Sequence, residues 1–120
     1  ILVVEDNAIN QLFLQKSLEK LGHEARCVAN GQKALECLRT ARFDCILMDI
    51  QMPVMDGTQA TRHIRQEMGL SLPIIALTAH AMHGYREKFL EQGFDEYLPK
   101  PVSIAELTKV IQKVCLQTPN

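Results

Sequence analysis

The chain has 120 residues, of which 47% are hydrophobic and 22% are charged, and its formal net charge at pH 7 is -1. A chain of this length can bury roughly 65% of its unfolded surface, so one domain can fold without disulfides or a structural metal. The small net charge gives no reason to expect nucleic acid or an anionic membrane as a partner, and no apolar run is long enough to span a membrane.

The four cysteines form no C-x-x-C pair and lie in segments patterned as strands or helices. This usage is typical of reduced, structural thiols in a cytoplasmic protein. No signal peptide is visible, and the chain begins on the apolar run Ile1–Val4 without a methionine. We therefore expect residues 1–120 to form a single domain that was excised from a longer chain.

The first third of the chain predicts a strand, a helix, a second strand and a second helix. Ile1–Val4 is wholly apolar and predicts a buried strand, and Glu24–Val28 has the mixed polarity of a strand at the edge of a sheet. Between them, Gly22 ends a helix. Its apolar face is expected to comprise Ile9, Leu12, Phe13, Leu18 and Leu21. The second helix follows Asn30-Gly31, with apolar positions at Ala34, Leu35 and Leu38.

The middle of the chain is organised around the apolar run Cys45–Met48, which predicts a strand buried on both faces. This strand ends at the carboxylate of Asp49, and the loop that follows is marked by Pro53 and Gly57. A third helix is expected from about Thr58 to Met68. Its inward positions are Ala60, Thr61, Ile64 and Met68.

The last third continues the alternation. The apolar run Ile74–Leu77 predicts a strand that ends at Thr78, and a weakly periodic helix is expected around Met82–Gln92. Glu96–Leu98 predicts a short final strand, which Lys100 follows closely. Ser103 and Glu106 then form a capping box for the last helix. The buried face of that helix is expected to comprise Leu107, Val110, Ile111 and Val114.

Strands that alternate with helices five times predict an α/β domain with helices on both faces of a parallel sheet. Right-handed crossovers favour the flavodoxin-like, doubly wound arrangement of five strands in the order 2-1-3-4-5. In such a sheet the carboxyl ends of the strands share one edge, where ligands bind. The polar residues that follow the strands, and that we therefore expect to converge there, are Glu5, Asp6, Asp49, Thr78 and Lys100.

The residue types at this edge indicate phosphoryl chemistry. Carboxylates crowded together repel as anions, and Mg²⁺ removes that cost while accepting an oxygen-only, partly hydrated site. The ammonium of Lys100 and the hydroxyl of Thr78 suit phosphoryl oxygens. The carboxylate of Asp49 can itself attack phosphorus and form an aspartyl phosphate. The alternative is a cluster of structural salt bridges.

Four motifs occur along the chain in a characteristic order: Ile1-Leu2-Val3-Val4-Glu5-Asp6-Asn7, Met48-Asp49-Ile50-Gln51-Met52-Pro53-Val54-Met55-Asp56-Gly57, Ala76-Leu77-Thr78-Ala79, and Tyr97-Leu98-Pro99-Lys100-Pro101. With these motifs the chain resembles a receiver domain of two-component signalling over essentially its whole length. The resemblance implies that Asp49 is the phosphoacceptor and that Lys100 pairs with the phosphoryl group. Thr78 would move toward that group, and Tyr97 would turn inward and reshape the face made by the fourth helix, the fifth strand and the fifth helix.

The resemblance also implies a Mg²⁺ cofactor and a cis peptide bond between Lys100 and Pro101. The implied direct ligands of the metal are Asp6, Asp49 and the main-chain carbonyl of Gln51. Glu5 would assist, directly or through a water molecule.

Further details resemble the receivers of hybrid sensor histidine kinases: Asn10 beyond the first motif, Gln51-Met52-Pro53, and the run from Thr78 to Met82. The implied partners are the phosphohistidine domain of a histidine kinase and a histidine phosphotransfer domain, without nucleic acid and without membrane contact by this domain itself. The domain would be cytoplasmic, and its parent would be a hybrid histidine kinase, a phosphotransferase, with anchoring of the parent in the inner membrane left open. The domain would promote its own phosphorylation and dephosphorylation.

Two alternatives remain at this stage. The domain could be the receiver of a freestanding response regulator, or an interaction module that works without phosphorylation. A stand-alone aspartyl-phosphate phosphatase is disfavoured, because position 51 is Gln where that chemistry places a second acid.

Overall fold

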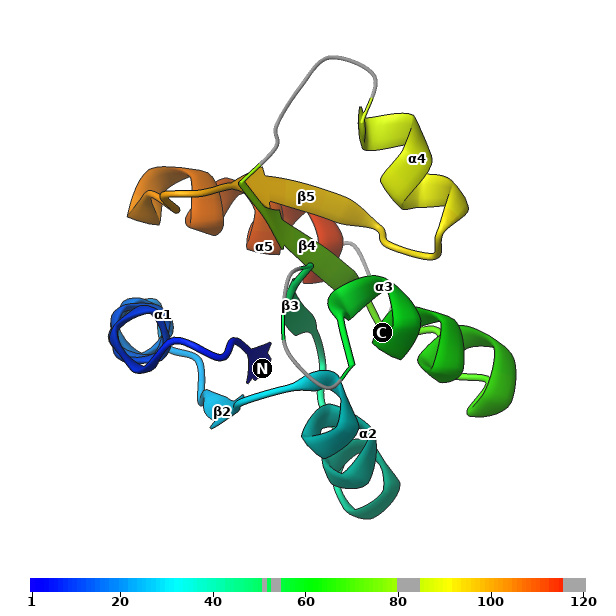
Figure 1. Cartoon of the computed structure of the whole chain (residues 1–120). Helices are drawn as coiled ribbons and strands as arrows, with labels where there is room; N and C mark the ends of the chain where they lie inside the picture. Colours follow the sequence, from blue (N-terminus) through cyan, green and yellow to red (C-terminus); the bar gives the residue numbers. More distant parts are fainter. Residues whose placement is uncertain (51, 53–54, 80–84, 116–120) are drawn as a thin grey trace.

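The computed structural model describes residues 1–50, 52, 55–79 and 85–115. Strands and helices alternate along these residues, with a π-helical turn, η1, following α3 (Figure 1). Their bounds are β1 (Leu2–Val4), α1 (Ala8–Lys20), β2 (Arg26–Val28), α2 (Gly31–Thr40), β3 (Ile46–Asp49), α3 (Gly57–Arg62), η1 (His63–Glu67), β4 (Ile74–Thr78), α4 (Tyr85–Glu91), β5 (Glu96–Pro99) and α5 (Ile104–Cys115).

The strands form one parallel sheet in the order β2-β1-β3-β4-β5, which confirms the predicted topology. The register pairs Val3 with Leu47 and Leu47 with Ile75, so the apolar runs of the three interior strands lie side by side. Every residue of β1, β3 and β4 is buried, whereas the residues of β2 are half-buried or exposed. The mixed polarity of the second strand therefore matches its place at the edge.

Alternate residues of the strands point to opposite faces and build two cores. Val4 and Met48 belong to the core under α2, α3 and α4, whereas Val3 and Leu47 belong to the core under α1 and α5. Figure 1 shows α1 and α5 on one side of the sheet and the other helices on the opposite side. Burial on both faces explains why the interior strands are apolar without alternation.

The predicted face of the first helix is correct at Leu18, which is fully buried, and wrong at Ile9, Leu12 and Phe13. The side chains of Ile9, Leu12 and Phe13 are 78%, 53% and 42% exposed, and α1 instead packs on the sheet through Leu14 and Leu18. Both sets satisfy helical spacing, so the sequence pattern alone could not choose between them. The same rotation buries Ser17, whose hydroxyl donates to the carbonyl of Phe13 at 2.8 Å and so remains paired.

Two other predicted helices differ in detail from the structure. The third runs as α3 and then as the π-helical η1, with Ala60, Thr61 and Ile64 buried as predicted and Met68 half-buried. The fourth ends at Glu91, next to the expected Gln92, and its predicted start at Met82 lies outside the described residues. Within the described part of the chain, no helix combines the length and the apolar character needed to cross a membrane.

The last helix behaves as its sequence predicts. The Ser103 hydroxyl accepts a hydrogen bond from the main-chain N–H of Glu106 at 3.1 Å, which caps α5. Leu107 and Ile111 are fully buried, and Val110 and Val114 pack against the same core at partial exposure. The peptide bond between Lys100 and Pro101 is cis, as expected.

Candidate active site at the carboxyl ends of the strands

The strands deliver the predicted polar residues to one edge of the sheet. Glu5 and Asp6 follow β1, Asp49 is the last residue of β3, and Thr78 is the last residue of β4. Lys100 follows β5, and its main-chain N–H donates to the carbonyl of Thr78 at 2.8 Å, which extends the pairing of the two strands. Because parallel strands end on the same side, five residues from four places in the sequence become neighbours.

The ammonium of Lys100 bridges two buried carboxylates. Its Nζ lies 2.8 Å from Oδ2 of Asp49 and 3.3 Å from Oε2 of Glu5. Asp49 is 2% exposed and Glu5 is 1% exposed, whereas the Lys100 side chain is 27% exposed. A cation at the mouth of the site therefore faces two carboxylates held beneath it.

Asp6 completes the acidic cluster from the solvent side. One carboxylate oxygen each of Glu5, Asp6 and Asp49 lies within 4.8 Å of the others, and Asp6 is exposed. Two unit charges ~4 Å apart repel by about 4 kcal/mol at an effective dielectric constant of about 20, so the cluster favours a cation beyond Lys100.

The start of α3 holds the main chain of Asp49 in place. The N–H of Gly57 donates to the carbonyl of Ile50 at 3.0 Å, and a Cβ at position 57 would overlap the carbonyl oxygen of Asp49. Asp56 caps this helix, and a reciprocal bond from Gln59 completes a capping box. The sequence marked Gly57 only as a loop residue. Its close approach to β3 depends on packing that the sequence pattern does not reveal.

The pKa of the Glu5 carboxyl is raised above its ordinary value. Burial is the main cause, and the neighbouring Asp49 carboxylate adds to it, while the N–H of Asn7 and the charge of Lys100 act in the opposite direction. The pKa of Lys100 is also raised. Burial alone would lower it, but the hydrogen bond and charge of Asp49, together with Glu5, outweigh burial.

The raised pKa of Glu5 gives a prediction for stability. The folded protein holds this proton more tightly than the unfolded chain, so the Glu5 contribution to the free energy of unfolding falls as pH rises from 4.5 through the raised pKa. In Glu5→Gln we expect the free energy of unfolding to lack this decrease with rising pH, because glutamine does not titrate. At pH 8 without metal the variant should be about 1 kcal/mol more stable than the wild type, since its amide can donate to Asp49. Chemical denaturation across pH measures both proteins. Identical pH dependence in the two would contradict the prediction.

The donor set fits a divalent cation that prefers oxygen. Oε2 of Glu5 is buried and accepts no hydrogen bond from the described residues, although Lys100 lies nearby. A buried carboxylate oxygen that accepts no hydrogen bond and lies beside two further carboxylates is the arrangement that Mg²⁺ satisfies. Glu5, Asp6 and Asp49 are the described residues that could hold the metal. The main-chain carbonyl of Gln51, predicted as a further ligand, lies outside the described residues.

The predicted switch residues lie at the same edge and on the neighbouring face. Thr78 is 4% exposed at the end of β4. Tyr97, in the middle of β5, is half-buried, and its ring packs on Phe89 of α4 with the centroids 5.8 Å apart. Tyr97 therefore contacts the helix that the predicted switch would reshape.

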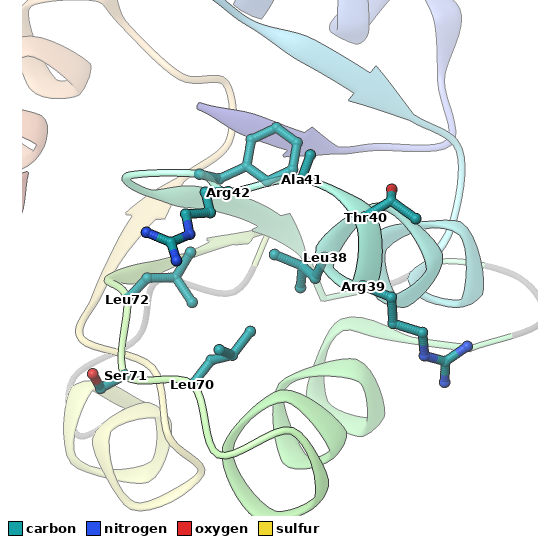
Figure 2. A pocket seen from close by; sticks show the side chains of 9 residues that line it. Leu38, Arg39, Thr40, Ala41, Arg42, Leu70, Ser71 and Leu72 are labelled. Carbon is teal, nitrogen blue, oxygen red and sulfur yellow. The ribbon is translucent and has the colours of Figure 1, made fainter.

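Two hollows have different relations to this site. A cavity of about 720 Å³ lies at the opposite edge of the sheet, where Leu38, Leu70 and Leu72 point into it and Arg42 extends toward Leu72 (Figure 2). It contains none of the acidic cluster. A groove of about 600 Å³ runs instead from the exposed face of α1 to the site. Its lining includes Glu5, Ile9, Asn10, Phe13 and Lys100.

Sequence reasoning did not identify the contacts that Asn10 and Gln11 make with Glu5. The side-chain amide of Asn10 donates to Oε1 of Glu5 at 3.4 Å, and that of Gln11 donates to the Glu5 carbonyl. In the sequence, Asn10 stood out only by its position after the first motif. That position indicated a resemblance to the receivers of hybrid sensor histidine kinases and predicted no contact with Glu5.

Comparisons with known proteins agree with this geometry. Residues 1–112 match the response regulator receiver domain family. The sensor histidine kinase GacS of Pseudomonas protegens is 45% identical over 117 residues, covering 94% of this chain and 13% of GacS. The chain thus spans about an eighth of the length of this relative.

Two solved structures are similar throughout. The receiver domain of a sensor histidine kinase from Pseudomonas aeruginosa PAO1, which has a magnesium ion coordinated in its active site cleft, is 45% identical with a TM-score of 0.86, covering 97% of this chain and 96% of that one. The receiver domain in a Saccharomyces cerevisiae complex of a histidine phosphotransfer protein with its downstream response regulator is 32% identical with a TM-score of 0.87, covering 96% and 87%. The match along the chain, the sheet order and the acidic edge agree, and the protein belongs to the response regulator receiver domain family.

Proposed function

We propose that the domain accepts a phosphoryl group on Asp49 from a phosphohistidine of a partner protein. The observation that carries the proposal is the placement of Lys100 Nζ 2.8 Å from the Asp49 carboxylate, with Glu5 and Asp6 beside it. This constellation offers a nucleophile, a cation for the phosphoryl oxygens and a set of metal ligands in one pocket.

The reaction needs little covalent chemistry from the protein. An oxygen of Asp49 forms a bond to phosphorus as the N–P bond of phosphohistidine breaks, and the bonding pair remains on the imidazole, which takes up a proton from solvent. Lys100 is already at hydrogen-bonding distance and neutralises charge on the transferred group. Water later attacks phosphorus, the bond to the Asp49 oxygen breaks, and inorganic phosphate leaves with the carboxylate restored. The same groups that neutralise charge in the first step act in the second, and in this way the domain promotes both its phosphorylation and its dephosphorylation.

The metal supplies further charge neutralisation at the phosphoryl oxygens when it is bound. Asp6 and Asp49 would hold it directly, with the carbonyl of Gln51, and Glu5 would assist. The structure of the similar Pseudomonas aeruginosa receiver domain with magnesium in its cleft supports this assignment. The buried Oε2 of Glu5, which accepts no hydrogen bond from the described residues, supports it independently.

A small phosphodonor tests the proposal without any partner. Acetyl phosphate with Mg²⁺ is expected to add the mass of one phosphoryl group, measured by intact mass spectrometry, and the addition should require the metal. Asp49→Asn keeps the size of the side chain but removes the nucleophile, so it should abolish labelling. Labelling that survives in this variant would contradict the role of Asp49.

The partner that we propose for this reaction docks on α1. Ile9, Leu12 and Phe13 are exposed, and Lys100 lines the same groove as Ile9 and Phe13. Apolar side chains exposed together beside a reactive group are typical of a protein interface. The complex of a similar receiver with a histidine phosphotransfer protein supports a histidine phosphotransfer domain as the occupant.

Substitution on this face should separate docking from chemistry. We expect Phe13→Asp to lower kcat/KM at least ~10-fold for transfer from the phosphorylated histidine domain of Pseudomonas protegens GacS, since a hot-spot residue at an interface is worth about 2 kcal/mol or more. Its rate with acetyl phosphate should not change. Leu90→Asp is the matched control, because Leu90 is 45% exposed on α4. An equal loss in both variants would contradict docking on α1.

The similarity of the chain to GacS supports a hybrid sensor histidine kinase as the parent protein. We propose that this domain lies in the cytoplasm, and we leave open whether the parent is anchored in the inner membrane. In that setting Asp49 receives the phosphoryl group from the kinase histidine and passes it to a histidine phosphotransfer domain. Thr78 and Tyr97 then reshape the face made by α4, β5 and α5. Residues 1–120 would act as one receiver domain within this longer protein.

A further inference from the structure

The first turn of α1 surrounds one oxygen of the Glu5 carboxylate. Oε1 of Glu5 accepts from the main-chain N–H of Asn7 at 3.2 Å and from the side-chain amide of Asn10 at 3.4 Å. The other oxygen, Oε2, accepts no hydrogen bond from the described residues and lies 3.3 Å from Lys100. The two oxygens of this buried carboxylate therefore have different surroundings.

The difference fixes the rotation of the carboxylate. With two donors on Oε1, the plane of the group is set so that Oε2 faces Lys100 and the acidic cluster. A single donor would leave the group freer to turn about its last bond, where the rotational preference is broad. We propose that Asn10 is a positioning residue that aims Glu5 into the metal site and so sets the affinity of the domain for Mg²⁺. This inference rests on the proposed function.

The contact serves the site and is not required by the helix. The side chain of Asn7 caps α1 by accepting from the N–H groups of Ile9 and Asn10, so the helix start is satisfied without the Asn10 amide. Alanine also has a higher helix propensity than asparagine. Loss of the Asn10 side chain should therefore not weaken the fold, and its effect should appear at the metal.

The position of Asn10 gives this contact a second consequence. Asn10 is exposed and lines the groove between α1 and Lys100, where Ile9 and Phe13 also lie. A partner seated in that groove would rest against the amide that holds Glu5. The side chain of Asn10 would therefore affect both the affinity for the metal and the docking of a partner. Among the polar residues at the start of α1, Asn10 is the one that both contacts the Glu5 side chain through its own side chain and lines the groove.

Metal titration of the intact domain tests the inference. We expect Asn10→Ala to raise the dissociation constant for Mg²⁺ roughly 10-fold by calorimetry, as loss of an outer-shell partner of a metal ligand does. Its thermal midpoint in EDTA should not fall. Gln32→Ala, which removes an exposed amide from the first turn of α2, is the matched control and should bind Mg²⁺ like the wild type.

A double-mutant cycle separates action through Glu5 from an unrelated effect. In the Glu5→Ala background, Asn10→Ala should cause no further loss of Mg²⁺ affinity. If Asn10→Ala leaves the affinity unchanged, or weakens it equally with and without Glu5, the inference is overturned while the proposed function stands. If the wild type itself binds no Mg²⁺, the metal part of the proposed function fails instead.

Discussion

Lys100→Met is expected to slow phosphorylation of Asp49 on the order of 100- to 1,000-fold, because removal of one pre-positioned charge partner from a transition state has effects of that size. The ammonium of Lys100 lies 2.8 Å from the Asp49 carboxylate, to which the phosphoryl group would be attached. Methionine keeps most of the aliphatic stem and removes only the charge. The rate of phosphoryl transfer from acetyl phosphate at saturating Mg²⁺ measures the effect.

Lys113→Met is the matched control for that substitution. Lys113 on α5 also pairs with a buried carboxylate, at 2.8 Å from Glu96, but this pair lies at the start of β5, away from the site. Both variants lose a cation that faces a buried acid, so both should lose some stability. Only Lys100→Met should lose phosphorylation. Comparable rates in the two variants would contradict the assigned role of Lys100.

Gly57→Ala is expected to lower the free energy of unfolding by about 3 kcal/mol, the upper range for a methyl group forced into a filled space. The new Cβ would overlap the carbonyl oxygen of Asp49 and lie 3.0 Å from Cα of Ile50, and these are backbone atoms that cannot turn aside. Because α3 would have to shift away from β3, phosphorylation of Asp49 should fall in the same variant. Chemical denaturation and acetyl phosphate labelling measure the two effects.

Gly22→Ala provides the comparison for Gly57. Gly22 has φ of 88°, and a Cβ added there would have no atom within 4 Å, so alanine meets backbone strain alone, worth about 1–2 kcal/mol. Gly57→Ala should be the more damaging of the two, and only it should affect labelling. A loss at Gly57 no greater than that at Gly22 would show that the contact with Asp49 is not tight.

The fold was predictable because the interior strands are short, are apolar up to the polar residues Asp49 and Thr78 that end β3 and β4, and alternate with helices. Once the sheet order followed from that alternation, the meeting of Glu5, Asp49 and Lys100 followed from the shared direction of the strands. Residues far apart in sequence could be placed together because the topology of the sheet brings them to one edge. Their meeting does not depend on the details of side-chain packing. This is the part of the site that a pattern of residues can specify.

The surroundings of the site depended on side-chain packing, which the pattern of residues in the sequence does not specify. The helix α1 carries two apolar stripes of equal helical spacing, and contact with the sheet selects Leu14 and Leu18. The exposed stripe, which includes Phe13, is what leaves a face for a partner. The contact of Asn10 with Glu5 likewise arises from the geometry of one helical turn. Sequence reasoning therefore found the reactive groups and missed the surfaces and supports around them.

The most direct test of the account is to locate the phosphoryl group on the wild-type domain. After reaction with acetyl phosphate and Mg²⁺, borohydride reduction converts an aspartyl phosphate to homoserine, and peptide mass spectrometry identifies the altered residue. The account predicts a single modified position, Asp49, whose carboxylate lies against Lys100. Modification at Asp6, at a histidine or at several carboxylates without preference for Asp49 would contradict it.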